Sequence, residues 1–98
     1  NSQIETLVDL YEDGQLQNLE TLGFAFSVLS LELLNEKAYT QAKMVIRNGL
    51  LYFQNIEEPF GIKTMYERYV ILFGQLDEKS KKLYYEQAIE RLNYALNL

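Results

Sequence analysis

Cysteine, histidine and tryptophan are absent from this chain of 98 residues, and proline occurs only once. Without cysteine there is no disulfide, no thiolate ligand and no thiol nucleophile. Without histidine the chain lacks the usual general base near neutral pH and the most common zinc ligand, so a Ser-His-Asp triad is excluded. No constellation of carboxylates, lysines or tyrosines stands out in their place. We therefore expect no enzymatic activity, no catalytic residues, no metal site and no cofactor.

Long apolar runs are also missing. The longest run, around Phe24–Leu34, is interrupted by two serines and a glutamate, whereas a span of the bilayer needs roughly 20 apolar residues. The chain begins at Asn1 without a methionine or a signal-like segment, and the lack of cysteine fits a reducing compartment. We expect residues 1–98 to form a single helical-repeat domain, the C-terminal fragment of a longer cytoplasmic protein that makes no membrane contact.

Basic residues are few and unevenly placed. The chain has 9 Lys and Arg against 14 Asp and Glu, and the first basic residue is Lys37. An acidic surface repels phosphate, so we expect no contact between this fragment and nucleic acid. The one basic cluster, Lys79, Lys81 and Lys82, is interpreted as a solvated helix end.

Helical periodicity is what the chain has in abundance. Apolar residues recur three and four positions apart, and strand-like alternation is absent except inside these helical patterns. Pro59 lies in the clearest loop, Glu57–Gly61, and Asp77 is expected to cap the last helix. The sequence therefore predicts an all-α fold of about five helices, over approximately residues 4–11, 18–34, 38–54, 62–76 and 78–96.

Two successive helical hairpins share one pattern of large and small residues. The first contains Phe26, Leu29, Ser30, Leu33, Ala42, Ile46 and Gly49; the second contains Tyr66, Tyr69, Val70, Phe73, Ala88, Leu92 and Ala95. This pattern resembles tetratricopeptide repeats, although the second hairpin needs about six extra residues between its halves. The resemblance implies antiparallel helical hairpins stacked as a short, tetratricopeptide-like right-handed solenoid.

Peptide-binding solenoids of this type use the first helix of each hairpin to line a concave surface. Its predicted residues combine apolar pockets with groups that can bond a peptide backbone: Phe24, Ser27, Leu31, Asn35, Thr64, Glu67, Arg68 and Ile71. An alternative interpretation is that Phe24, Leu31 and Leu34 are simply buried against the preceding helix, residues 4–11.

The last predicted helix has a wide apolar stripe, whereas a helix that closes a solenoid should be more polar. We therefore expect a homodimer whose interface includes Tyr85, Ile89, Leu92 and Leu96. Missing upstream repeats are another candidate cover for an open end of the solenoid.

The segment Asp9–Glu20 has a partial EF-hand outline. Asp9, Asp13 and Glu20 occupy ligand positions and Gly14 occupies the sharp turn, but Tyr11 stands where a third oxygen ligand is needed. The sequence leaves calcium binding open against the simpler interpretation, an acidic turn between two helices.

Three stretches resemble the C-terminal part of Rgg/GadR/MutR-type regulators of Gram-positive bacteria. They are Ala38–Ala42, Phe60–Phe73 with its Tyr-Glu-Arg-Tyr, and Glu86–Leu92. In that family a helix-turn-helix domain binds DNA, and a helical-repeat domain dimerises and binds a short signalling peptide in quorum sensing. The resemblance implies a ligand-sensing and dimerisation domain that does not bind DNA itself. The alternative is a general tetratricopeptide-like scaffold that binds a partner protein.

Overall fold

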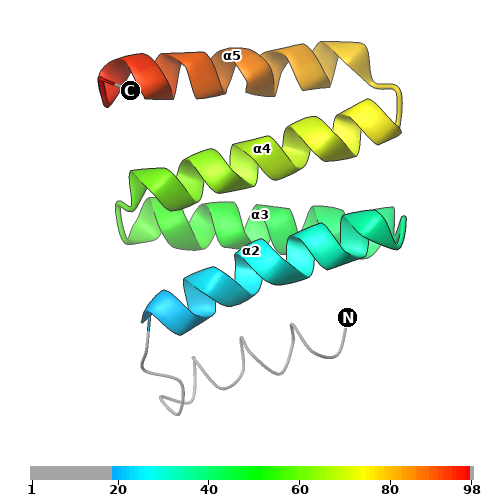
Figure 1. Ribbon diagram of the computed structural model, residues 1–98, viewed down its shortest axis with the longest axis horizontal. Coiled ribbons are helices and arrows are strands. Elements are labelled where there is room, and N and C mark those ends of the chain that lie inside the picture. Colours follow the sequence, from blue (N-terminus) through cyan, green and yellow to red (C-terminus); the bar gives the residue numbers. More distant parts are fainter. Residues whose placement is uncertain (1–18, 98) are drawn as a thin grey trace.

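The computed structural model describes residues 19–97, and this part of the chain is α-helical without any strand. Successive helices run antiparallel, as Figure 1 shows. The all-α prediction is confirmed for these residues, whereas the helix predicted at residues 4–11 lies outside them. The four helices are α2 (Leu19–Asn35), α3 (Tyr39–Asn55), α4 (Pro59–Gln75) and α5 (Lys79–Ala95).

The helices repeat with a period of 20 residues, which the sequence analysis did not detect. Each helix is 17 residues long, and a turn of three residues joins it to the next. The second residue after each helix adopts the left-handed conformation, with φ between 55° and 59°. These residues are Lys37, Glu57, Asp77 and Asn97. None of these residues is a glycine, although glycine is the residue most often found at this position.

The first three turns have the same hydrogen bonds. In the first turn, the Lys37 amide donates to the Leu34 carbonyl at 3.1 Å and the Ala38 amide donates to the Leu33 carbonyl at 2.9 Å. This pair of bonds is the Schellman motif, which satisfies carbonyls that would otherwise be unpaired at the end of the helix. Because all three turns are equally short, the extra residues predicted within the second hairpin do not exist as an insertion: α5 follows α4 as closely as α3 follows α2.

The predicted starts of α4 and α5 are both wrong. Pro59 is the first residue of α4 rather than the centre of a loop, because its fixed φ suits the first helical position and its missing N–H is not needed there. The Glu58 side chain caps this helix. Asp77 does not cap α5; it adopts the left-handed conformation, and Glu78 directly precedes the helix.

The core lies between neighbouring helices, and α2 contacts α4 as well as α3. A small residue permits one close approach: a Cβ at Gly49 would lie 2.6 Å from the Met65 sulfur and 3.2 Å from the Phe26 Cβ. The predicted pairing of small and large residues is present at this point. The buried hydrophobic side chains are Leu22, Phe26, Leu33, Leu34, Ala42, Val45, Ile46, Phe53, Met65, Tyr69, Leu72, Phe73 and Ala88.

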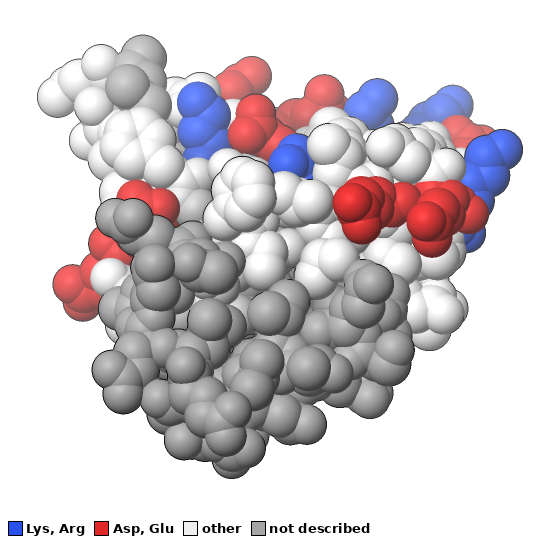
Figure 2. Space-filling view, turned by 60° about the horizontal axis from the view of Figure 1, so that its bottom comes forward, with Lys and Arg blue, Asp and Glu red and all other residues white. Residues whose placement is uncertain are grey.

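The charge of the described residues is almost balanced. Residues 19–97 contain ten acidic and nine basic side chains, so most of the net charge of −5 comes from residues 1–18. Figure 2 shows charges of both signs interspersed on one face of the molecule. Within residues 19–97, no helix has the length and apolar character needed to cross a membrane.

Candidate functional site

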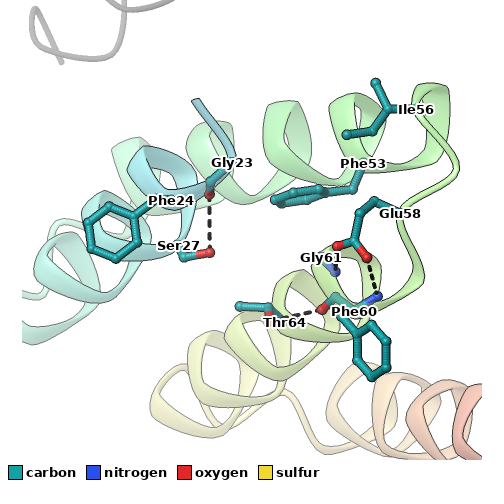
Figure 3. A pocket seen from close by; sticks show the side chains of 9 residues that line it. All are labelled: Gly23, Phe24, Ser27, Phe53, Ile56, Glu58, Phe60, Gly61 and Thr64. Atoms are coloured by element: carbon teal, nitrogen blue, oxygen red, sulfur yellow. Dashed lines mark hydrogen bonds between the residues drawn. The ribbon is translucent and has the colours of Figure 1, made fainter. Parts of the chain in front are cut away.

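A hollow of about 520 Å³ lies where the start of α2, the end of α3 and the start of α4 meet. We call it the Phe53 hollow. The Phe53 ring lies between two glycines: a Cβ at Gly23 would be 2.9 Å from the ring, and a Cβ at Gly61 would overlap it. The two glycines therefore make room for the ring. The hollow is lined by Gly23, Phe24, Ser27, Phe53, Ile56, Glu58, Phe60, Gly61 and Thr64 (Figure 3).

Two exposed aromatic side chains border this hollow. Phe24 on α2 is 71% exposed and Phe60 on α4 is 57% exposed, while Phe53 at the bottom is buried. Exposed apolar side chains beside a concave surface are typical of binding sites. Leu31 is also exposed, whereas Leu34 is buried, with 1% of its surface exposed. The alternative interpretation buries these side chains against a helix at residues 4–11, which lies outside the described residues, so it stays a prediction.

Polar groups in the Phe53 hollow are already oriented by the helices. The Ser27 hydroxyl donates to the Gly23 carbonyl at 3.2 Å, and the Thr64 hydroxyl donates to the Phe60 carbonyl at 3.0 Å. A hydroxyl that donates its proton in this way keeps lone pairs that can accept a hydrogen bond. Both side chains can therefore accept N–H groups of a peptide backbone.

The carboxylate of Glu58 holds the N-terminus of α4 beside the same hollow. Its two oxygens accept hydrogen bonds from the amides of Gly61, at 2.6 Å, and Phe60, at 3.3 Å. These bonds satisfy two of the helix's unpaired N–H groups. They also fix the place where Phe60 and Gly61 enter the wall of the hollow.

A second hollow, of about 550 Å³, lies between α4 and α5. We call it the Arg68 hollow. The guanidinium of Arg68 reaches from α4 to α2 and donates to the Ser27 carbonyl from Nε, at 3.4 Å, and from Nη2, at 3.3 Å. Burial lowers the pKa of Arg68 and the neighbouring Glu67 opposes that shift. The lining residues are Glu67, Arg68, Val70, Ile71, Glu86, Ile89 and Glu90.

Charge distinguishes the second hollow from the first. Three carboxylates face one guanidinium there, and the guanidinium is already bonded to a backbone carbonyl. The excess negative charge favours a cationic group such as an amine. The Phe53 hollow, in contrast, is mainly apolar and contains a single carboxylate, Glu58, which is engaged by the backbone.

Six of the eight residues predicted for the peptide surface line these two hollows. Leu31 and Asn35 are exposed and line neither of them. Phe53 is not among the predicted residues, because it belongs to the second helix of its hairpin and reaches the surface only through the gap left by two glycines. The available signal was the presence of Gly23 and Gly61 inside helical stretches. Of the predicted residues, Phe24, Ser27 and Thr64 line the Phe53 hollow, and Glu67, Arg68 and Ile71 line the Arg68 hollow.

The residues predicted for the dimer interface lie on α5 or, in the case of Leu96, directly after it, and all are partly buried within the chain. The Tyr85 ring stacks on Tyr69, with centroids 4.5 Å apart. Ile89, Leu92 and Leu96 are half-buried. Part of the apolar stripe therefore packs against α4. The exposed large apolar side chains of α5 are Leu83, Tyr84 and Tyr94.

Among the residues that the structure describes, no three Asp or Glu side chains are grouped so that they could hold a metal ion. The possible calcium ligands Asp9 and Asp13 lie outside these residues.

No protein-family model, no curated protein and no solved structure matches this chain.

Proposed function

We propose that this chain is the ligand-sensing and dimerisation domain of a bacterial transcriptional regulator, and that it binds a short signalling peptide without contacting DNA itself. The observation that carries the proposal is the pair of hollows, one between α2, α3 and α4 and the other between α4 and α5, which the hydrogen bond from Arg68 to Ser27 joins. The resemblance to Rgg/GadR/MutR-type regulators supports the regulatory role, and a protein with this role would act in the cytoplasm. The stacked hairpins would then form a short right-handed solenoid of the tetratricopeptide type.

The chemistry of the two hollows indicates how a peptide would lie. An apolar side chain fits the Phe53 hollow between the exposed rings of Phe24 and Phe60. The hydroxyls of Ser27 and Thr64 would accept backbone N–H groups beside it. The amino terminus of the peptide, or a basic side chain, would lie in the Arg68 hollow with its carboxylates.

Dimerisation would convert this binding into a signal. The proposed interface comprises Tyr85, Ile89 and Leu92 of α5 and Leu96 directly after it, and Ile89 also lines the Arg68 hollow. A peptide that contacts Ile89 would bind two dimer arrangements with different affinities. It would thereby shift their populations and change the spacing of the attached DNA-binding domains.

Selection from a random heptapeptide phage library tests the peptide proposal. Synthetic copies of the enriched sequences would be titrated by fluorescence anisotropy against the domain and against Phe60→Ala. The matched control is Leu83→Ala, since Leu83 is 54% exposed but lies on α5 away from both hollows. We expect Phe60→Ala to weaken binding about tenfold or more, equivalent to ~1.4 kcal/mol, and Leu83→Ala to leave it unchanged. Equal effects of the two variants would contradict the proposed site.

Light scattering across a concentration series tests the dimer. We expect a dimer for the unaltered domain and a monomer for Ile89→Glu, with Gln87→Glu as the control for added charge on an exposed position of the same helix. Circular dichroism would show whether Ile89→Glu remains folded. A folded, unaltered domain that stays monomeric at every concentration would refute dimerisation, and a general interaction scaffold would then be the better explanation.

A further inference from the structure

A third hollow, of about 290 Å³, lies at the opposite end of the helices from the Phe53 hollow, next to the turn between α4 and α5. We call it the Phe73 hollow. It is built from one residue of α3, two of α4 and three of α5. Neither the peptide surface nor the dimer interface proposed above accounts for its two lysines. The lining residues are Lys43, Tyr69, Phe73, Lys81, Tyr84 and Tyr85.

Aromatic rings form the apolar wall of this hollow. The rings of Tyr85 and Phe73 are nearly parallel, with an angle of 12° between their planes and 5.8 Å between their centroids. Tyr85 also stacks on Tyr69, and Tyr84 meets Tyr85 edge to face at 5.0 Å. Because Tyr69 and Phe73 are buried, this wall is fixed before any ligand arrives. A flat apolar group can stack against such a wall.

Two ammonium groups lie close to one ring. Lys43 Nζ is 5.9 Å and Lys81 Nζ is 5.4 Å from the centroid of Phe73. Lys81 is paired with the exposed carboxylate of Glu78 at 3.3 Å, whereas Lys43 makes no ion pair with any residue in the described part of the chain. An aromatic ring compensates an exposed cation only weakly. The space beside Lys43, the ammonium group without an ion pair, is therefore a favourable place for an anion.

We propose that the Phe73 hollow binds a small organic acid in which a carboxylate is attached to a flat apolar group. The carboxylate would lie between Lys43 and Lys81, and the flat group would stack on the aromatic wall. The volume is at the small end for ligand sites, which limits the apolar part to about one ring. The phenols of Tyr69 and Tyr85 are protonated at neutral pH, since their ordinary pKa is 10.0 and burial raises it further, and they therefore do not repel the acid. A free aryl acid and the last residue of a peptide that ends in phenylalanine share this chemistry.

Phenylacetate is a suitable probe, with phenylacetamide as its uncharged counterpart. Binding would be followed by NMR titration of the tyrosine ring resonances at low ionic strength. For a ligand of this size we expect a Kd of about 1 mM, and weaker binding at high salt because the contact is partly exposed. Phenylacetamide should bind at least fivefold more weakly. A tripeptide ending in phenylalanine, with a free or an amidated terminus, distinguishes the two sources of the acid: tighter binding of the free terminus than of phenylacetate points to a peptide end.

Substitutions separate the site from a general effect of positive charge. Lys43→Gln and Lys81→Gln should each weaken phenylacetate binding at least threefold. Lys79→Gln removes the same charge from an exposed position that does not line the hollow, and should change the Kd less than twofold. All three replaced side chains are exposed, so the variants should remain folded. Equal affinity for phenylacetate and phenylacetamide, equal effects of the three variants, or no binding at 10 mM phenylacetate (about ten times the expected Kd) would overturn the proposal.

Discussion

Replacing Gly61 with alanine tests the close packing that forms the Phe53 hollow. A Cβ at Gly61 would overlap three atoms of the Phe53 ring, and the ring cannot move away freely because Gly23 lies close to it on α2. Gly74 is a matched control, since it is also in α4, near the other end of the helix. A Cβ there would meet nothing nearer than Lys82 side-chain carbons at 3.7 Å, which is an ordinary contact.

Two effects set the size of the change. Alanine is favoured over glycine in a helix by up to ~1 kcal/mol, and this gain is smaller near the helix ends. Adding a methyl group to a filled core costs about 1–3 kcal/mol. Gly74→Ala experiences only the first effect, so its free energy of unfolding should rise by about 0.5 kcal/mol. Gly61→Ala experiences both, and we expect a net loss of ~1–2 kcal/mol.

Thermal unfolding followed by circular dichroism measures both variants. In a domain of this size 1 kcal/mol shifts Tm by about 4–8 °C, so the two variants should differ by roughly 6 °C or more. In a double-mutant cycle Gly61→Ala should cost less in a Phe53→Ala background, because Phe53→Ala removes Cγ, Cδ1 and Cε1, the ring atoms that the new methyl group meets. A Gly61→Ala variant as stable as Gly74→Ala would refute the packing of Phe53 between the two glycines.

Three further predictions follow from single contacts. Glu58→Ala removes the cap of α4 and should lower the free energy of unfolding by ~1 kcal/mol in urea denaturation; an unchanged urea midpoint would mean that the cap is not formed. Asn93 lies 20 residues after Phe73 and 40 after Phe53, at the repeat position that those two buried rings occupy, and its Oδ1 is buried without a hydrogen-bond partner in the part of the chain described. Asn93→Leu removes this unpaired polar atom and should therefore raise Tm by about 4 °C or more. A lower Tm would contradict this prediction. Burial raises the pKa of Tyr85 above 10.0 in the folded protein. The unfolded chain therefore loses this proton at a lower pH than the folded protein does, and the free energy of unfolding falls as pH rises through 10. Tyr85→Phe should make Tm fall less steeply between about pH 9 and 11, and an equally steep fall would show that other groups cause it.

The helices were predictable because their signal is local. Apolar residues three and four positions apart mark each buried helix face, and four predicted helices overlap those observed. The turns were not predictable in the same way, because Lys37, Glu57 and Asp77 adopt a left-handed conformation that usually indicates glycine. A proline by itself predicts a loop around Pro59, although proline also suits the first position of a helix, which is where Pro59 lies.

The candidate site was predictable only where it lies on the first helix of a hairpin. Helical spacing together with the resemblance to tetratricopeptide repeats predicts Phe24 and Thr64 on one surface, and the structure brings both into the Phe53 hollow. The bottom of that hollow depends on three elements, because Phe53 of α3 fills the space left by Gly23 of α2 and Gly61 of α4. A contact between residues so far apart in sequence has no periodic signature, and only the packed structure reveals it.

The central claim is that the α2–α4 face is the ligand surface, and the glycines provide reporters for it. Gly23 and Gly61 line the Phe53 hollow, whereas Gly74 lies near the other end of α4. Amide ¹⁵N–¹H spectra would be recorded while a library-selected peptide is titrated into the domain. We predict that the Gly23 and Gly61 signals shift with one common Kd while the Gly74 signal stays in place. A peptide that saturates the domain and shifts Gly74, or that leaves Gly23 and Gly61 unchanged, would contradict the proposed ligand surface.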